Sequence, residues 1–419
     1  MNVNTLRPDF MNSIVKVETG GSPIHIYSGE FRIPDPPRRP YPVPAMKLGK
    51  VSGKGWSDEE AHASCLGEAA ERRSGMFRGD EHLVTSPLPE LTQPAIDPLS
   101  FLQFSGRQYA GRNDWNAIFG QTQYIPEPWE KEHSLEWTPC QSLSEGRAKL
   151  VPAAACFLRY APPEPRIFFP NLTTGYAAAP TVEQATLRGF LELVERDAVA
   201  LWWYNRCLRP AIDIDRMDDE DLSRVKSYLS DRGRSLHLLD VTTDFGIPVV
   251  VAVSATVEGE AILFGMAADF ELLDAVRRAA AELLQMLGPE RYWSRSSMLE
   301  HYQLPTDRQA WVFGAKLENQ KYVLPEGVSS RVPAAPPAPS VPGRLAQCIR
   351  AAARVGTEIL VCDVTRADIG VPAVKVIVPG LRSSWAQLGP GRLYQAPVAL
   401  GWQSHVLAEE ELNPFPFFL

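Results

Sequence analysis

The 419-residue sequence lacks the features of membrane-spanning and secreted chains. No apolar run approaches the roughly 20 residues that cross a bilayer. The first ten residues, MNVNTLRPDF, contain neither the charged nor the apolar segment of a signal peptide. The formal charge of −8 does not suit a protein that covers nucleic-acid phosphates. These absences predict a cytoplasmic protein that binds neither a membrane nor a nucleic acid.

Several common metal-binding and catalytic motifs are missing as well. The six cysteines are scattered without a C-x-x-C pair, which suits neither a zinc site nor a disulfide framework and favours reduced, mostly buried thiols. The histidines show no H-E-x-x-H spacing, and G-x-S-x-G is absent. Neither the G-x-x-x-x-G-K-[ST] loop nor G-x-G-x-x-G occurs. Any nucleotide chemistry must therefore use a different arrangement.

Three long helices are expected from the sequence. A serine or threonine followed three residues later by Glu or Gln predicts helix starts at Ser57 and Thr181, with ends near Arg73 and Tyr204. A third helix is expected over residues 271–287. All three contain charged residues within alanine- and leucine-rich segments, which makes them the most informative part of the chain.

Two further segments resemble each other. DVTTDFGIPVVVAVSA begins at Asp240 and DVTRADIGVPAVKVIVPG begins at Asp363, and each follows an apolar run. They predict two similar strand–turn–strand units, although two unrelated hairpins would also fit. Residues 84–165 look rich in loops, and residues 1–48 look like a proline-rich extended arm that precedes a domain spanning 49–419. Helices interleaved with strands indicate an α+β or α/β fold.

The first two helices each carry two glutamates three residues apart, followed by arginine. Glu68 and Glu71, and likewise Glu192 and Glu195, lie side by side on one helical face. Two such charges about 5 Å apart repel by roughly 3 kcal/mol at an effective dielectric near 20. The second helix is apolar nearly all round and looks buried, so its carboxylates need neutralisation. An ordinary solvated helix face is the alternative.

A divalent cation would neutralise several such carboxylates at once. Magnesium fits best, because it takes hard oxygen ligands and is usually held by a few carboxylates together with phosphate oxygens. The third helix adds Glu282, with Arg278 one turn before it. Lys54, flanked by glycines just before the first helix, has the chemistry to meet a phosphate. The residues alone thus predict a carboxylate-held metal with phosphate nearby.

Three ordered segments resemble the signatures of the YcaO family. These are GKGWSDEEAHASCLGEAAERRS, which contains the pattern S-x-x-x-E-x-x-E-R, then TTGYAAAPTVEQATLRGFLELVERDA, and finally AVRRAAAELLQ, which ends in E-x-x-Q. The resemblance runs from about residue 49 to the C-terminus. It implies an α+β fold with mixed sheets, duplicated strand–turn–strand elements and helices that line a site for ATP and Mg²⁺.

The resemblance also implies roles for individual residues. Five glutamates would hold magnesium and phosphate oxygens: Glu68, Glu71, Glu192, Glu195 and Glu282. Six residues would contact the nucleotide: Ser64, Arg72, Arg196, Arg278, Lys54 and Gln285. Family members usually have asparagine where this chain has Pro180, and arginine is common where it has Leu287.

The two ends of the chain resemble the azoline-forming cyclodehydratase branch of the family. Such enzymes convert Cys, Ser or Thr of a ribosomal precursor peptide into thiazolines or oxazolines, and their proline-rich C-terminus reaches the active site. Here that tail would place Pro414, Pro416 and Leu419 at the catalytic centre. A frayed hydrophobic end is the alternative.

The same resemblance implies partners. Because 48 residues are too few for a leader-recognition domain, a separate leader-binding protein resembling ubiquitin-activating enzymes is expected beside the precursor peptide. A flavin-dependent dehydrogenase in the same synthetase complex and a homodimer are further expectations. Backbone thioamidation, a non-catalytic scaffold and a metal-dependent ATPase acting on another target are the alternative functions.

Overall fold

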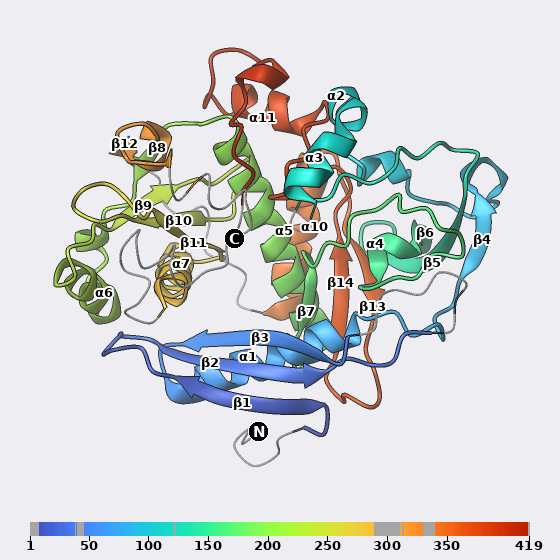
Figure 1. The fold of residues 1–419 in the computed structure, drawn as a ribbon, viewed down its shortest axis with the longest axis horizontal. Coiled ribbons are helices and arrows are strands. Elements are labelled where there is room, and N and C mark those ends of the chain that lie inside the picture. Colours follow the sequence, from blue (N-terminus) through green and yellow to red (C-terminus); the bar gives the residue numbers. More distant parts are fainter. Residues whose placement is uncertain are drawn as a thin grey trace.

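A computed structural model describes residues 8–37, 39, 46–120, 123–288, 311, 314–329 and 340–417. Three β-sheets are arranged around three long helices (Figure 1). This arrangement is the α+β fold with mixed sheets that the sequence predicted. None of the described helices is long and apolar enough to cross a membrane.

The first sheet corrects one expectation. Its strands are β1 (Met11–Val17), β2 (His25–Arg32) and β3 (Leu48–Gly55), paired antiparallel in that order. The first two lie in the segment expected to be an extended arm, and that expectation is wrong over residues 11–32. Phe10, Met11 and Phe31 are buried there beneath the first long helix. The division of the chain at residue 48 stays a prediction.

The second sheet has the order β11-β10-β9-β8-β12. Its strands are β8 (Arg209–Ala211), β9 (His237–Asp240), β10 (Val249–Ser254), β11 (Leu263–Ala268) and β12 (Pro325–Val328). β10 and β11 are buried along their whole length. Burial on both faces explains why these strands read as continuous apolar runs rather than as alternating patterns.

The third sheet has the order β4-β5-β13-β14-β7, with β6 paired to β5. Its strands are β4 (Val84–Pro87), β5 (Ser134–Ser142), β6 (Ala148–Pro152), β7 (Tyr176–Ala178), β13 (Leu360–Asp363) and β14 (Ala373–Ile377). Three of them lie within residues 84–165, where the sequence showed no long periodic segment. The nine-residue β5 was missed because proline and polar residues interrupt its alternation.

The two similar segments are confirmed as equivalent hairpins in different sheets, β9–β10 and β13–β14. In the first, Asp240 Oδ1 accepts from the Thr242 N–H at 3.0 Å, and Thr242 Oγ1 accepts from the Val249 N–H at 3.1 Å. In the second, Asp363 and Thr365 make the corresponding bonds at 2.9 and 3.1 Å. The shared pattern makes these the same local structure rather than two unrelated turns.

The three predicted helices are present with the expected ends. They are α1 (Asp58–Ser74), α5 (Val182–Tyr204) and α7 (Leu272–Leu287). Ser57 Oγ accepts from the Glu60 N–H and Thr181 Oγ1 from the Gln184 N–H, each at 3.2 Å, as N-caps do. The remaining α-helices among the described residues are α2 (Gly106–Ala110), α3 (Arg112–Phe119), α4 (Ala153–Cys156), α6 (Glu220–Ser230), α10 (Val341–Arg354) and α11 (Arg392–Ala399).

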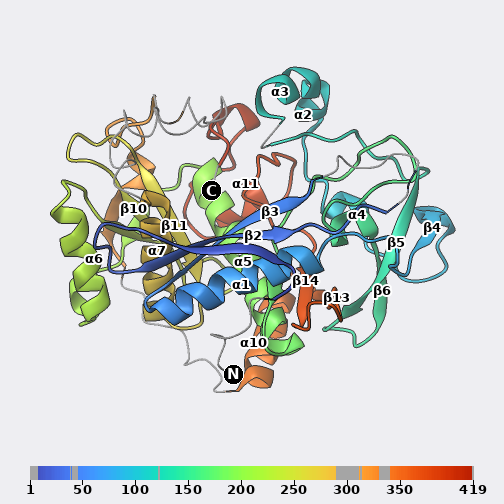
Figure 2. The ribbon, with the colours of Figure 1, turned by 60° about the horizontal axis from the view of Figure 1, so that its bottom comes forward.

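The long helices bring the sheets together. α5 is buried between the second and third sheets, in contact with β10, β11, β7 and β14. α1 packs across the first sheet, as Figure 2 shows, and it also contacts β7 and β14. α7 packs on β10 and β11 and reaches β3. One side of each long helix therefore faces the space where the three sheets meet.

Candidate active site

The first wall of the candidate site is the polar face of α1. Glu68 Oε2 accepts from the Ser52 N–H of β3 at 3.0 Å, and its other oxygen lies 3.2 Å from Arg72. The Arg72 Nε is 3.8 Å from the carboxylate of Glu71. This position of the helix depends on Gly53, because a Cβ there would lie 2.1 Å from the backbone nitrogen of Cys65.

The second wall is the middle of α5. Glu192 Oε2 accepts from the Gly175 N–H at 2.8 Å, and Glu195 Oε2 accepts from the Ala268 N–H of β11 at 3.2 Å. Arg196 lies 3.0 Å from Glu195 and 3.7 Å from Glu192. One guanidinium thus stands between two carboxylates that are each anchored by a backbone amide.

The third wall is α7. Glu282 Oε2 accepts from the Met266 N–H at 2.6 Å, two residues before the β11 amide that binds the α5 glutamate. Its other oxygen lies 3.7 Å from the Lys54 ammonium. Gln285 donates to the Ser52 hydroxyl at 2.8 Å and so joins α7 to β3. β11 therefore fixes one carboxylate from α5 and one from α7.

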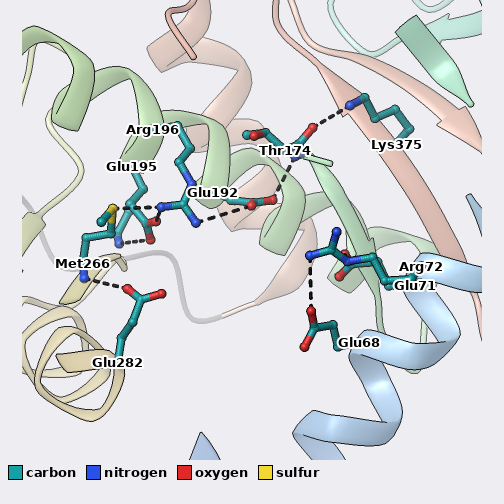
Figure 3. Close-up of polar contacts among 12 residues, drawn as sticks. Glu68, Glu71, Arg72, Thr174, Glu192, Glu195, Arg196, Met266, Glu282 and Lys375 are labelled. Carbon is teal, nitrogen blue, oxygen red and sulfur yellow. Dashed lines mark hydrogen bonds and ion pairs between the residues drawn. The ribbon is translucent and has the colours of Figure 1, made fainter. Parts of the chain in front are cut away.

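The three walls meet, as Figure 3 shows. The carboxylates of Glu68, Glu192, Glu195 and Glu282 lie around one space, with Arg72 and Arg196 beside them. The residues come from segments more than 200 positions apart, and the paired spacing within each helix is what places two acidic groups on one face. The predicted set of five glutamates is brought together.

Burial and mutual repulsion perturb two of these carboxyl groups. Burial raises the pKa of Glu71 well above its usual range, and the nearby charge of Glu192 makes the next largest contribution in the same direction. Burial likewise raises the pKa of Glu195 to about 7, against the opposing effect of Arg196 and with a contribution from Glu282. Protonation relieves such repulsion, and so does a cation with oxygen ligands. The donor set fits a hard divalent ion.

The other residues predicted to contact the nucleotide lie around the same space, apart from Ser64. Lys54 and Gln285 bind other site residues, as described above. Arg278 donates to Asp269 at 2.9 Å and to the Ala268 carbonyl at 3.3 Å beside the Glu195 anchor. Ser64 is exposed on α1, one turn before Glu68. The Nε–H of Arg72 is buried without a hydrogen-bond acceptor among the described residues, which leaves a donor free.

The C-terminal tail is buried rather than frayed. Trp203 of α5 donates to the Phe415 carbonyl at 2.6 Å, and Phe417 is 3% exposed with its ring 5.0 Å from that tryptophan. Pro414 is exposed and Pro416 is buried, and both line a cavity of about 380 Å³. Trp203 follows Arg196 by two helical turns, so the described part of the tail packs beside the C-terminal end of α5. Leu419 lies outside the described residues.

Sequence reasoning missed three residues beside the site. Asp269 anchors Arg278, Gly175 anchors Glu192, and Lys375 on β14 donates to the Thr174 carbonyl at 2.6 Å. Thr174 and Gly175 lie in TTGYAAAP, which belongs to one of the recognised family segments, but nothing in its sequence indicates which groups these residues contact. Lys375 lies 183 positions from Glu192, and the packing of α5 on β14 together with the pairing of β14 with β7 brings it near.

The spacing of the cysteines in the sequence did not indicate that three of them lie together in the fold. Cys140, Cys156 and Cys362 have their sulfur atoms within 4.8 Å of one another, a grouping that could hold a metal ion. The expectation that the cysteines suit no metal site is therefore corrected for these three. Their shell is apolar. Burial raises the pKa of Cys156, and the contact with the Cys362 thiol, followed by burial, raises the pKa of Cys140. All six cysteines are buried free thiols, as predicted.

Solved structures share this architecture. A heterocyclase in complex with substrate and cofactor is 34% identical with a TM-score of 0.88, over 98% of this chain and 55% of its own. The heterocyclase TruD is 38% identical with a TM-score of 0.76, over 85% of this chain and 50% of its own. This chain thus spans about half the length of both heterocyclases. YcaO from Methanopyrus kandleri, bound with AMPPCP and Mg²⁺, shares the fold at 20% identity and a TM-score of 0.62, over 88% and 86% of the two chains.

Among curated sequences, an uncharacterized protein of Methanothermobacter thermautotrophicus is 28% identical over 361 residues, which is 81% of this chain and 84% of that protein. The family profile described as YcaO cyclodehydratase, ATP- and Mg²⁺-binding, matches residues 52–382. That match includes all three long helices and every glutamate of the site. The chain therefore belongs to the YcaO cyclodehydratase family.

Proposed function

We propose that this protein is an ATP-dependent cyclodehydratase that forms thiazoline or oxazoline rings in a peptide. The observation that carries the proposal is the convergence of carboxylates from α1, α5 and α7 beside two arginines. Family membership and the similarity to two heterocyclases support the same activity.

Within this proposal, magnesium would be held by oxygen atoms of the five glutamates around the site, namely Glu68, Glu71, Glu192, Glu195 and Glu282. Bound magnesium would supply charge stabilisation for the phosphates of ATP. The basic groups of Arg72, Arg196, Arg278 and Lys54 would face the remaining phosphate charge. Gln285 and Ser64 would complete the nucleotide contacts, the latter only if the ligand extends over the exposed face of α1.

The proposed reaction joins a side chain to its preceding amide. The thiol or hydroxyl of Cys, Ser or Thr attacks the carbonyl carbon and loses its proton, and the amide oxygen becomes an oxyanion. That oxygen takes the γ-phosphoryl group of ATP, with ADP as the leaving group, and then leaves as phosphate, while the amide nitrogen loses its proton and forms the C=N bond of the ring. The protein would contribute positioning and stabilisation of negative charge.

The tail and the partners complete the proposal. Pro414 and Pro416, with Leu419 beyond the described residues, would border the site where the peptide amide lies, because Trp203 and Phe264 hold the tail along α5. The substrate would be a ribosomal precursor peptide, presented by a leader-binding partner that resembles ubiquitin-activating enzymes. A flavin-dependent dehydrogenase and a homodimer are further components of the proposed complex. The length of the two heterocyclases, about twice this chain, leaves room for such a partner function.

The test is product analysis with ATP, Mg²⁺, a candidate precursor peptide and the leader-binding partner. Each ring lowers the peptide mass by one water, whereas thioamidation raises it by exchange of oxygen for sulfur. We expect mass loss with the wild-type protein and none with Glu195→Gln, while Glu258→Gln on an exposed turn keeps full activity. Equal ring formation by Glu195→Gln would contradict catalysis at this site.

A further inference from the structure

Lys375 of β14 is a buried ammonium group close to the acidic site. The residue is 6% exposed, and its Nζ donates to the Thr174 carbonyl at 2.6 Å and to the Leu172 carbonyl at 3.4 Å. The same nitrogen lies 4.4 Å from the ring centre of Tyr176. Among the described residues, no carboxylate lies within ion-pair distance of it. Burial of a cation without an anionic partner is costly, so its retention needs an explanation.

The segment that Lys375 holds is the segment that orients Glu192. Gly175 follows the two carbonyls bound by the lysine, and its N–H donates to Glu192 Oε2 at 2.8 Å. Its own carbonyl accepts from the Val376 N–H at 2.7 Å. With φ at +88° and no room for a Cβ beside the Val376 carbonyl, this glycine has a fixed conformation. Figure 3 shows the continuous path from Lys375 through Thr174 to Glu192.

We propose that Lys375 is a positioning residue for the magnesium–nucleotide site. Its ammonium clamps the 172–175 backbone against β14, and the clamped Gly175 amide holds the Glu192 carboxylate in place. The inference rests on the proposed function, since Glu192 is one of the proposed metal ligands. Groups that orient a metal ligand through such contacts typically affect metal affinity by 10–100-fold.

A purely electrostatic role of Lys375 predicts the opposite change in Mg²⁺ affinity when the lysine is removed. If Lys375 acted only through its charge, its removal would leave the carboxylates more negative and would strengthen Mg²⁺ binding. If it acts as a clamp, its removal frees the 172–175 backbone, misplaces Glu192 and weakens Mg²⁺ binding. The direction of the change therefore separates the two roles.

The experiment combines magnesium titration in the presence of a non-hydrolysable ATP analogue with hydrogen exchange of peptides that cover residues 172–176. For Lys375→Met we expect about tenfold weaker Mg²⁺ affinity and faster exchange in this segment. Lys375→Gln, which keeps a donor without the charge and is also informative should Lys375→Met not fold, should fall between wild type and Lys375→Met. Unchanged or tighter binding, or unchanged exchange at 172–176, would overturn the inference.

Two parallel variants complete the design. Lys149→Met removes a partly buried lysine, which pairs with Glu145 and Glu358 away from the site, and it should leave Mg²⁺ affinity as in wild type. Glu192→Gln should weaken it. If Glu192→Gln binds as tightly as wild type, the proposed site itself is wrong. If Glu192→Gln weakens binding and the Lys375 variants do not, only the positioning role fails.

Discussion

At the scale of single residues, the site is a set of carboxylates that repel one another in the free protein. Glu195 is 7% exposed, and burial raises its pKa to about 7. The Glu71 pKa is raised for the same reason, with the Glu192 charge adding to it. Because a cation binds the ionised carboxylates, protons held by these groups in the free protein leave when the cation arrives.

The Glu195 shift predicts how stability depends on pH without metal. The carboxyl group has a pKa near 4.5 in the unfolded chain and about 7 in the folded one. The folded state therefore binds more protons between these values, and the free energy of unfolding falls as the pH rises from 4.5 to 7, by roughly 3 kcal/mol from this group. Denaturation of metal-free wild type and Glu195→Gln across this range measures the effect.

The quantity to compare is the difference in free energy of unfolding between Glu195→Gln and wild type, because the other groups titrate in both proteins and their contributions cancel. We expect the stability of Glu195→Gln relative to wild type to increase steadily from pH 4.5 to 7 and then to level off. A difference that does not change with pH would show that Glu195 has an ordinary pKa.

The roles of single residues could be predicted from the sequence only where two residues of one type recur at helical spacing. The i, i+3 spacing of Glu68 with Glu71 and of Glu192 with Glu195 placed each pair on one face before any fold was known. The backbone amides of Gly175, Met266 and Ala268 that anchor carboxylates carry no sequence signal, because every residue has such a group. Their roles follow from tertiary contacts alone.

At the scale of elements, close contact between β3 and α1 sets the first wall of the site. A Cβ on Gly53 would lie 2.1 Å from the Cys65 nitrogen and 2.3 Å from the Ala61 carbonyl oxygen. These are backbone atoms of α1, which cannot rotate away as a side-chain end can. The close approach of the helix to the strand therefore requires glycine at residue 53.

This contact predicts opposite effects for two glycine-to-alanine changes. Gly53→Ala should lower the free energy of unfolding by about 3 kcal/mol, as overpacking of a core does, and should weaken Mg²⁺ binding through Glu68. Gly67→Ala, in the interior of α1 with nothing within 4 Å of the added Cβ, should raise stability by roughly 0.5–1 kcal/mol. Denaturant unfolding of both variants measures the pair; equal effects would contradict the packing described here.

Element prediction worked where long capped helices or matching hairpins were present and failed for short strands. β1 contains Met11, Ile14 and Val17 at spacings that give no clear alternation, and prolines after β2 suggested an extended arm. Pairing of β1 with β2, which in turn pairs with β3, and burial under α1 decide its structure. The β2–β3 pairing joins residues 16 to 30 positions apart, from Arg32 with Leu48 to His25 with Gly55, and is not visible in a local pattern.

At the scale of the whole molecule, the fold places three helices from distant parts of the chain around one space. α5 lies between the second and third sheets, α1 covers the first sheet, and α7 reaches from β11 to β3. The buried C-terminal tail packs against the end of α5. The central claim is that the paired carboxylates of these helices form a single site for Mg²⁺ and ATP.

Calorimetric titration with Mg²⁺ and ATP tests this claim most directly, on wild type, Glu195→Gln and the exposed control Glu258→Gln. We predict binding by the wild type and by the control, and loss of binding in Glu195→Gln. Undiminished binding by Glu195→Gln would place the nucleotide elsewhere, and the absence of binding by wild type would contradict a site that this chain completes by itself.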